Sequence, residues 1–399
     1  MSDMANLESL NPMGLLMITP TRMDKIEAAP NTPLASTDPI TELKNALHPL
    51  VQYLIIERII DHVDDARSYV LVPDVAKGTE SLAYFSAGQY LSISLAIDGA
   101  TVSKPYSISS APVGALKGAY TITVKRSDGG FASCYILDNW KEGDSVVASG
   151  PEGLFTYEGI RDAKQVIGLA GGSGITPFLS LARAVVSGTE DFCLTLLYGS
   201  RTSAGILFKD EFDALEAACA KIKVVHILSD EEAEGYEQGF ITAELIKKYA
   251  PAEDYSLFIC GPQAMYNFLD AEIEKLDLPH KFIRHELFGE VKNPEKNADY
   301  PADALGYEYK LVVNIRDEKV ETRCAASETL MVAMERAKVP VPTQCRSGEC
   351  GFCHSYLISG DVYMPASADG RRLADSRYGY IHPCSTFPLS DVELEVPSK

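Results

Sequence analysis

Four cysteines near the carboxyl end of the chain have a spacing suited to binding iron. Cys345, Cys350 and Cys353 stand within nine residues, and thirty residues separate Cys353 from Cys384. The order C-x4-C-x2-C…C is the plant-type [2Fe–2S] pattern, in which four thiolates hold two irons. The spacing therefore predicts a [2Fe–2S] cluster with these four cysteines as metal ligands.

A zinc site is the alternative for the same cysteines. Zinc sites usually pair cysteines as two C-x2-C knuckles, and only Cys350 and Cys353 form one here. Gly348 and Gly351 allow a close-set loop to turn and let backbone N–H groups approach the sulfurs, as a cluster requires. Iron is thus the favoured metal. The remaining cysteines, apart from Cys260, are expected to be small buried side chains.

A second group of residues lies at expected strand ends and at one helix start. The run Lys104-Pro105-Tyr106-Ser107 follows an expected strand, and Thr123-Val124-Lys125 ends another. Gly130, Ala132 and Ser133 then open an expected helix. Backbone N–H groups at a helix start, together with a serine hydroxyl, make an anion site.

A third group has the strand–loop–helix context of a dinucleotide site. Gly171, Gly172, Gly174, Thr176 and Pro177 follow the apolar run QVIGLA and precede a helix. The glycines let a cofactor approach the backbone, and the helix start favours a pyrophosphate. Ser200 and Arg201 end the next expected strand, where arginine suits a 2′-phosphate; NADH and NADPH both remain open. Cys260, Gly261, Pro262 and Met265 follow a further strand, and Cys260 there could also be a plain apolar strand end.

The elements that must position these groups fall into successive segments. Residues 1–50 form an extension with one short amphipathic helix at 40–50. Short β-branched and aromatic runs over 51–158 predict a small antiparallel barrel. Alternating strands and helices over 159–290 predict a doubly wound α/β domain. A polar linker at 291–307 leads to a small domain at 308–399 with a strand pair and a helix near 328–339.

Composition limits the possible partners. The chain has 399 residues, a formal net charge of −20 and a hydrophobic fraction of 46%. This charge argues against nucleic acid or an anionic membrane as partner. No run of about 18 apolar residues predicts a membrane-spanning helix, and the first residues are a poor signal peptide. We expect a cytoplasmic protein without membrane insertion.

Several of these motifs together resemble the ferredoxin–NADP reductase superfamily. Lys104-Pro105-Tyr106-Ser107 resembles its R-x-Y-S motif, and residues 308–399 resemble a plant-type ferredoxin domain. The domain order resembles that of oxygenase reductases. The resemblance implies a multidomain fold: an antiparallel β-barrel flavin domain, a doubly wound nicotinamide domain and a β-grasp ferredoxin domain.

The same resemblance implies roles for the site residues. Tyr106 would stack on the flavin, Ser107 would bond near its reactive edge, and Cys260 would lie near the nicotinamide C4; these are the predicted catalytic residues. Lys104 replaces an arginine that holds flavin phosphate, which leaves FAD and FMN both open. The other predicted flavin residues are Pro105, Thr123, Val124, Lys125, Gly130, Ala132 and Ser133.

The expected reaction is hydride transfer from NADH or NADPH to the flavin, followed by single-electron transfer to the [2Fe–2S] cluster. A protein acceptor would then take the electrons; an oxygenase, a demethylase, a corrinoid protein or another ferredoxin would each serve. Two other functions stay open, an electron-transfer subunit of a larger anaerobic complex and a slowly turning redox sensor.

Overall fold

The computed structural model describes residues 21–29, 38–127, 129–286 and 289–397. The chain forms two compact units, residues 1–45 and 46–399. Helix α2 (Arg22–Glu27) in the first unit begins at Thr21, which exchanges hydrogen bonds with Asp24 in a capping box. Helix α3 (Pro39–Leu47) confirms the predicted short helix. The first twenty residues and residues 30–37 of the predicted extension lie outside the described part.

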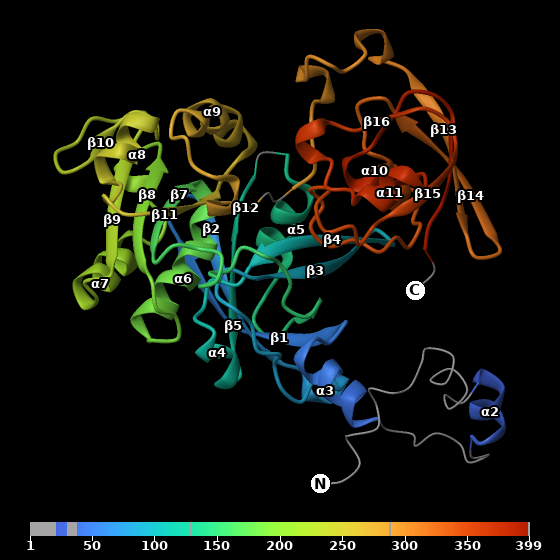
Figure 1. Ribbon diagram of the computed structural model, residues 1–399, viewed down its shortest axis with the longest axis horizontal. Helices are drawn as coiled ribbons and strands as arrows, with labels where there is room; N and C mark the ends of the chain where they lie inside the picture. Colours follow the sequence, from blue (N-terminus) through green and yellow to red (C-terminus); the bar gives the residue numbers. More distant parts are fainter. Residues whose placement is uncertain (1–20, 30–37, 128, 287–288, 398–399) are drawn as a thin grey trace, which may run out of the picture. The chain divides into compact units, whose positions relative to one another are not determined.

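Six antiparallel strands form the first domain of the second unit (Figure 1). They are β1 (Gln52–His62), β2 (Ala66–Pro73), β3 (Tyr90–Ile97), β4 (Ala100–Ser107), β5 (Tyr120–Lys125) and β6 (Ser145–Ala148). The sheet order is β4-β3-β6-β1-β2-β5, and a bridge between Ile108 and Ile122 joins its two ends. Alternate β-branched and aromatic side chains fill the interior, so the predicted antiparallel barrel is confirmed.

A six-stranded parallel sheet forms the second domain, with the order β10-β9-β8-β7-β11-β12. The strands are β7 (Gln165–Gly171), β8 (Cys193–Ser200), β9 (Ile222–Leu228), β10 (Glu237–Gln238), β11 (Tyr255–Cys260) and β12 (Ile283–Glu286). The helices are α6 (Thr176–Val186), α7 (Lys209–Ala218), α8 (Ala243–Tyr249) and α9 (Gln263–Glu274). Strand β7 lies between β8 and β11, so the strand order reverses there and a ligand crevice is expected at the carboxyl ends of β7 and β11.

The third domain has a mixed sheet with the order β14-β13-β19-β15-β17. Its strands are β13 (Glu308–Ile315), β14 (Glu318–Ala325), β15 (Ser355–Ser359), β17 (Tyr380–Ile381) and β19 (Val392–Glu395), and a separate pair joins β16 (Val362–Tyr363) to β18 (Phe387–Pro388). The predicted helix is present as α10 (Leu330–Arg336), which begins after its N-cap Thr329. Helix α11 (Leu373–Arg377) follows. The apolar face of α10 packs into the core of this domain.

The segment predicted as a linker packs against the third domain. Tyr300 and Ala304 share a small apolar core with Ala326, Tyr363 and Phe387. The Tyr300 hydroxyl donates a hydrogen bond to the Ala326 carbonyl oxygen over 3.0 Å. The third domain is therefore tied to the chain segment that precedes it.

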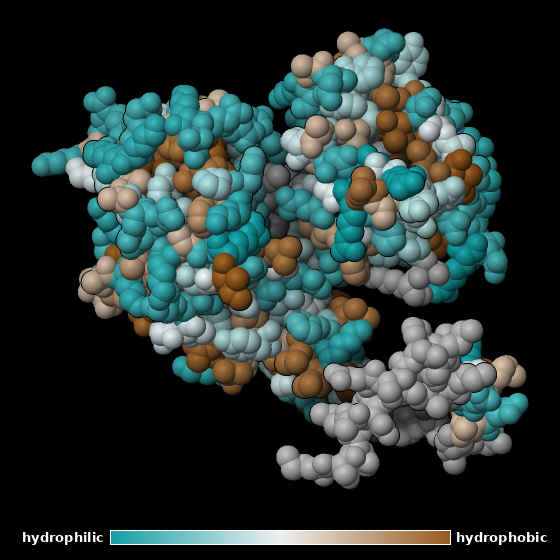
Figure 2. Space-filling model, in the orientation of Figure 1, coloured by the Kyte–Doolittle hydropathy of each residue, from teal (hydrophilic) through white to brown (hydrophobic). Residues whose placement is uncertain are grey.

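Hydrophilic residues cover most of the face shown in Figure 2, and the hydrophobic residues on it form separate patches. No helix in the described ranges is long and apolar enough to cross a membrane.

Candidate functional site

The four predicted metal ligands lie in two segments of the third domain. Cys345, Cys350 and Cys353 are on the loop between α10 and β15, and Cys384 is in the turn before β18. The Sγ atoms of Cys353 and Cys384 are 3.5 Å apart. A hydrogen bond between the thiols of Cys345 and Cys350 lowers the pKa of Cys345 and raises that of Cys350. The backbone N–H of Ser347 also donates to Cys345 Sγ over 3.5 Å. The fold thus brings all four thiols together.

This donor set fits a two-iron cluster. Cys350 is exposed, whereas the other three cysteines are buried. Backbone N–H groups of Cys350 and Phe352 point at sulfurs, over 3.4 Å to Cys345 Sγ and 3.5 Å to Cys350 Sγ. Within the described residues, no group of three or more His, Cys, Asp or Glu side chains is arranged to hold a single metal ion. A [2Fe–2S] cluster instead needs two thiolates at each of two irons.

The loop that carries Cys345 and Cys350 is pinned against the turn that carries Cys384. Gly348 has a φ of +85°, and a Cβ there would lie 2.1 Å from the Ala368 carbonyl oxygen and 2.6 Å from Ser385 Oγ. Only glycine combines this backbone conformation with this approach. The loop glycine therefore sets the separation of the two ligand segments.

Tyr106 and Ser107 end strand β4, where Tyr90 of β3 is the register partner of Ser107. Ser107 is buried, and its Oγ has no hydrogen-bond partner among the described residues. A buried hydroxyl without a partner costs free energy unless a ligand completes it, so this position fits a bound flavin. Burial raises the pKa of the Tyr106 phenol, which keeps the ring neutral.

Other predicted flavin residues on the barrel have their side chains engaged within the protein. Thr123 Oγ1 is 2.8 Å from Ser68 Oγ and 3.3 Å from Ser109 Oγ. Val124 is fully buried in the barrel core, and Pro105 on β4 is also buried. A cofactor at these positions would meet the backbone of β4 and β5 and not these side chains.

The predicted anion site lies at the start of helix α5 (Phe131–Asn139). Gly130 is the N-cap residue and supplies no side-chain cap, so the first N–H groups of the helix have no side-chain partner there. A Cβ on Gly130 would lie 2.5 Å from Ser133 Oγ and 2.8 Å from the Ser127 carbonyl oxygen. Ala132 is buried in the same turn. Uncapped N–H groups beside a glycine suit a phosphate.

The two lysines predicted to bind the flavin are already paired with carboxylates. Lys125 forms an ion pair with Asp64. Lys104 Nζ is 2.9 Å from Glu290 Oε1, and the same carboxylate binds Arg346, the residue after Cys345. Lys104 is thereby directed toward the iron–sulfur loop, whereas the sequence motif predicted a flavin phosphate as its partner.

The glycine-rich loop joins β7 to α6 at the expected crevice. Its predicted residues are Gly171, Gly172, Gly174, Thr176 and Pro177. Gly172 has a φ of +53°, and Thr176 Oγ1 donates a hydrogen bond to the Ser173 carbonyl oxygen over 3.0 Å. A Cβ on Gly174 would lie 2.2 Å from the carbonyl oxygen of Cys260. The loop therefore touches the end of β11 through backbone atoms.

Cys260 ends β11 and is buried, and burial raises the pKa of its thiol so that it stays protonated. Pro262 is the N-cap residue of α9. A Cβ on either Gly171 or Gly261 would lie 2.5 Å from Met265 Sδ. The ends of β7 and β11 and the first turn of α9 are thus in mutual contact.

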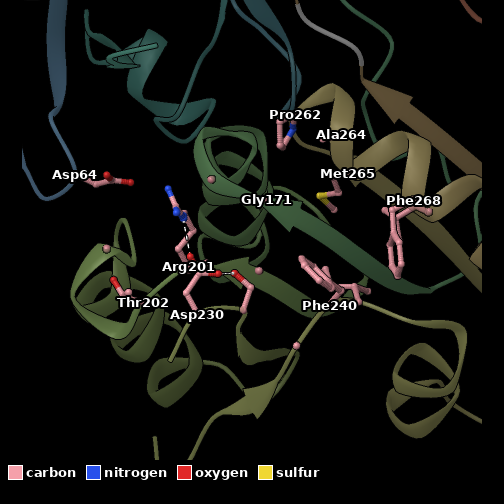
Figure 3. Close-up of a pocket in the computed structure, with 18 of the residues that line it drawn as sticks. Asp64, Gly171, Arg201, Thr202, Asp230, Phe240, Pro262, Ala264, Met265 and Phe268 are labelled. Carbon is pink, nitrogen blue, oxygen red and sulfur yellow. Dashed lines mark hydrogen bonds and ion pairs between the residues drawn. The ribbon is translucent and has the colours of Figure 1, made fainter. Parts of the chain in front are cut away.

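A cavity of about 750 Å³ runs along the carboxyl ends of these strands (Figure 3). Its volume is that of a cofactor pocket. Predicted residues that line it are Lys125, Gly171, Gly172, Ser200, Arg201, Pro262 and Met265. Predicted nicotinamide residues outside its lining are Gly174, Thr176, Pro177, Cys260 and Gly261.

The cavity also contains residues that sequence reasoning missed. Asp230 accepts a hydrogen bond from Arg201 Nε over 2.9 Å, and Figure 3 shows the pair at the same wall. Phe240 and Phe268 have ring centroids 5.6 Å apart and both remain partly exposed. Asp230 follows the end of β9, a position where α/β folds place ligand contacts. Its place in the sequence could therefore have indicated it. The meeting of the two phenylalanines depends on tertiary structure.

A second cavity, of about 460 Å³, is lined by residues of all three domains. Tyr90 and Glu152 come from the barrel, Glu286 from the end of β12, and Cys345 and Cys350 from the iron–sulfur loop. Glu286 is buried, its Oε2 has no hydrogen-bond partner among the described residues, and burial raises the pKa of its carboxyl. Sequence motifs gave no indication of Glu152 or Glu286.

Three family models match the chain. An oxidoreductase FAD-binding domain matches residues 54–157, an oxidoreductase NAD-binding domain matches residues 169–271, and a 2Fe-2S iron-sulfur cluster binding domain matches residues 313–389. The chain thus carries binding domains for FAD, NAD and a [2Fe–2S] cluster, in that order.

Curated relatives cover most of the chain. A glycine betaine monooxygenase reductase subunit from Pseudomonas aeruginosa is 27% identical over 351 residues, which are 85% of this chain and 93% of the relative. The ferredoxin reductase component of 3-ketosteroid-9-alpha-monooxygenase from Rhodococcus rhodochrous is 28% identical over 85% of this chain and 94% of its own. NADH oxidoreductase HCR from Escherichia coli is 27% identical over 78% of this chain and 88% of its own length.

A solved structure shows the same fold. It is titled phthalate dioxygenase reductase, a modular structure for electron transfer from pyridine nucleotides to [2Fe–2S]. Its TM-score is 0.62 at 24% sequence identity, over 87% of this chain and 97% of that chain.

Proposed function

Because the chain belongs to the ferredoxin–NADP reductase superfamily, with its FAD-binding, NAD-binding and 2Fe-2S domains in the order of phthalate dioxygenase reductase, we propose that it is the reductase component of an oxygenase system. It takes reducing equivalents from a nicotinamide dinucleotide and delivers single electrons to a protein acceptor. The relatives named as monooxygenase reductase components support an oxygenase as that acceptor.

The three-domain cavity is the observation that carries this proposal. Cys345 and Cys350 line it together with Tyr90, whose register partner on β4 is Ser107, and with Glu286 of the NAD-binding domain. A cluster at the cysteines and a flavin at Ser107 would therefore be neighbours across one cavity. Electron transfer requires the two cofactors to lie close together. Domains that only bound their cofactors independently would not need a shared cavity.

The chain's own residues would bind and orient the reactants. Ser107 has a free buried hydroxyl to offer a flavin, and Tyr106 supplies a neutral aromatic ring beside it. Cys260 stays a neutral thiol at the end of β11, so it orients the nicotinamide and does not exchange a proton. When bound, the flavin supplies the chemistry that turns one hydride into two single electrons.

NADH is the proposed electron donor. The charge of Arg201 is already matched by Asp230, and a 2′-phosphate at this wall would meet the Asp230 carboxylate. A relative named NADH oxidoreductase supports the same choice. We expect kcat/KM for NADH to exceed that for NADPH by at least roughly tenfold, since like charges repel at contact range. Asp230→Asn lowers the ratio of kcat/KM for NADH to that for NADPH, whereas Asp213→Asn on helix α7, outside the cavity lining, leaves it unchanged. If Asp230→Asn leaves the ratio unchanged, Asp230 does not determine the choice between NADH and NADPH.

The proposed location is the cytoplasm, where thiols stay reduced and available to iron. The electron order is tested with the FAD- and iron-loaded protein and NADH under anaerobic conditions. Flavin absorbance falls first, and the electron paramagnetic resonance signal of a reduced [2Fe–2S] cluster follows. Cys350→Ser abolishes the second step and spares NADH-dependent ferricyanide reduction, whereas Cys219→Ser, a half-buried cysteine of the NAD-binding domain, changes neither. Equal loss of both activities in Cys350→Ser refutes the order.

A further inference from the structure

A buried arginine stands between the iron–sulfur loop and the flavin-binding barrel. Arg346 directly follows Cys345, and its side chain is fully buried. Both of its Nη atoms bind Glu335 of α10, with Nη2 at 2.8 Å from Oε2. Nη2 also forms an ion pair with Glu290, and Nη1 donates to the carbonyl oxygen of Ser103 on β4 over 3.3 Å. One guanidinium thus contacts the ferredoxin domain, the preceding segment and the barrel.

Lys104 joins the same group from the barrel side. It is the neighbour of Ser103 on β4, and its Nζ lies 2.9 Å from Glu290 Oε1. Lys104, Glu290, Glu335 and Arg346 form what we call the junction ion cluster. Their side chains are 19%, 16%, 9% and 0% exposed, so water screens none of them well. The cluster therefore combines two basic side chains with two acidic ones.

The contacts within the junction ion cluster hold its charges in place. Burial disfavours the charged form of both groups, since loss of solvation lowers the pKa of Lys104 and raises that of Glu335. Charged groups persist at such depth when each touches an opposite charge. Removing one member leaves another buried and unpaired, so the domains would then separate locally or reorient. Buried ion pairs of this kind fix one arrangement of parts more than they add stability.

We propose that the junction ion cluster positions the iron–sulfur loop against strand β4 and thereby sets the rate at which electrons pass from the flavin site to the [2Fe–2S] site. The chain connects the two sites directly: Lys104 precedes Tyr106 by two residues, and Arg346 is bonded to Cys345. Lys104 acts as a positioning residue for the domain junction and not as a ligand of the flavin phosphate. This inference rests on the electron order proposed above.

Glu290→Gln is the main test variant, because Glu290 bridges Lys104 and Arg346. The substitution removes its negative charge and keeps the shape of the side chain. In the FAD- and iron-loaded protein, the rate of flavin reduction by NADH stays at the wild-type value. Reduction of the cluster slows by about tenfold, less than the roughly 100-fold that a full 1 Å misplacement of a reacting group can cost. Amide hydrogen exchange over residues 100–107 and 341–350 becomes faster, which reports the junction without any turnover.

Two further variants separate positioning from other roles. Lys104→Met retains FAD and slows cluster reduction like Glu290→Gln, and Lys104→Arg restores the rate. The double variant Lys104→Met/Glu290→Gln leaves Arg346 paired with Glu335 and recovers the rate to within about threefold of wild type, because the two changes are coupled. Lys338→Met is the matched control: this exposed lysine approaches Gly99 of the same barrel and is not a member of the junction ion cluster.

The following outcomes would overturn either this proposal or the proposed function. Loss of FAD from Lys104→Met, with a wild-type cluster-reduction rate once saturating FAD is added back, assigns Lys104 to the flavin phosphate and overturns the proposal. Wild-type rates and wild-type exchange in Glu290→Gln overturn it as well. A wild-type protein whose cluster NADH does not reduce overturns the proposed function instead, and the exchange measurement still decides whether the junction ion cluster holds the domains together.

Discussion

Gly174→Ala would force apart the two strand ends that frame the proposed nicotinamide site. The added Cβ would lie 2.2 Å from the carbonyl oxygen of Cys260 and 2.5 Å from its carbonyl carbon. The first distance is about 1.2 Å less than the 3.4 Å at which ordinary contact begins. Because the obstacle is backbone, either the loop after β7 or the end of β11 must move by about that amount. Overpacking of this kind costs roughly 1–3 kcal/mol of unfolding free energy.

A displacement of about 1 Å at a reacting centre costs on the order of 100-fold in rate. We therefore expect flavin reduction by NADH to slow by about 10- to 100-fold in Gly174→Ala, with FAD content unchanged. Anaerobic stopped-flow absorbance measures this single step. Gly159→Ala is the matched control, since its Cβ would find its nearest neighbour at 3.8 Å, an ordinary contact. A wild-type rate in Gly174→Ala, together with a lowered Tm, would show that this loop supports the fold and does not frame the nicotinamide.

Two further substitutions test the flavin site and the contribution of a buried histidine to stability. Tyr106→Ala weakens FAD retention by about fivefold or more, because aromatic contacts contribute roughly 0.5–1.5 kcal/mol beyond burial, whereas Tyr106→Phe retains FAD; equal FAD retention in both variants would mean that the ring does not stack on the flavin. Burial lowers the pKa of His226, whose two ring nitrogens have no hydrogen-bond partner among the described residues, so its contribution to stability is present above pH 6.5 and is lost as the pH falls. His226→Phe therefore flattens the fall in Tm between about pH 7 and pH 5.5, and the exposed His280→Phe does not; parallel curves for His226→Phe and wild type would contradict this assignment.

Local sequence patterns predicted those features of the site that depend on neighbours in the chain. The spacing of Cys345, Cys350 and Cys353 predicted a ligand loop, because a loop of that length can bring three thiols together. The glycines after β7 predicted a strand–loop–helix turn for the same reason. These patterns need no knowledge of distant residues, and the structure shows the corresponding loops where they were expected.

Features that depend on distant residues escaped prediction. Lys104 and its partner Glu290 are 186 positions apart, and nothing near either residue indicates the other. The motif therefore assigned Lys104 to the flavin phosphate, whereas the fold offers a buried carboxylate first. Phe240 and Phe268 likewise meet only because the segment after β10 passes beside α9.

This division between local and distant determinants has a functional consequence. In the proposed function, residues of the local motifs hold one cofactor each, so their substitution should remove a cofactor or a single step. The junction ion cluster and the three-domain cavity belong to no single motif, because their members come from separate domains. Substitutions there should leave each cofactor bound and each domain folded, and should change only how fast electrons cross between them. Measuring cofactor content and transfer rate on the same variant therefore distinguishes the two classes of residue.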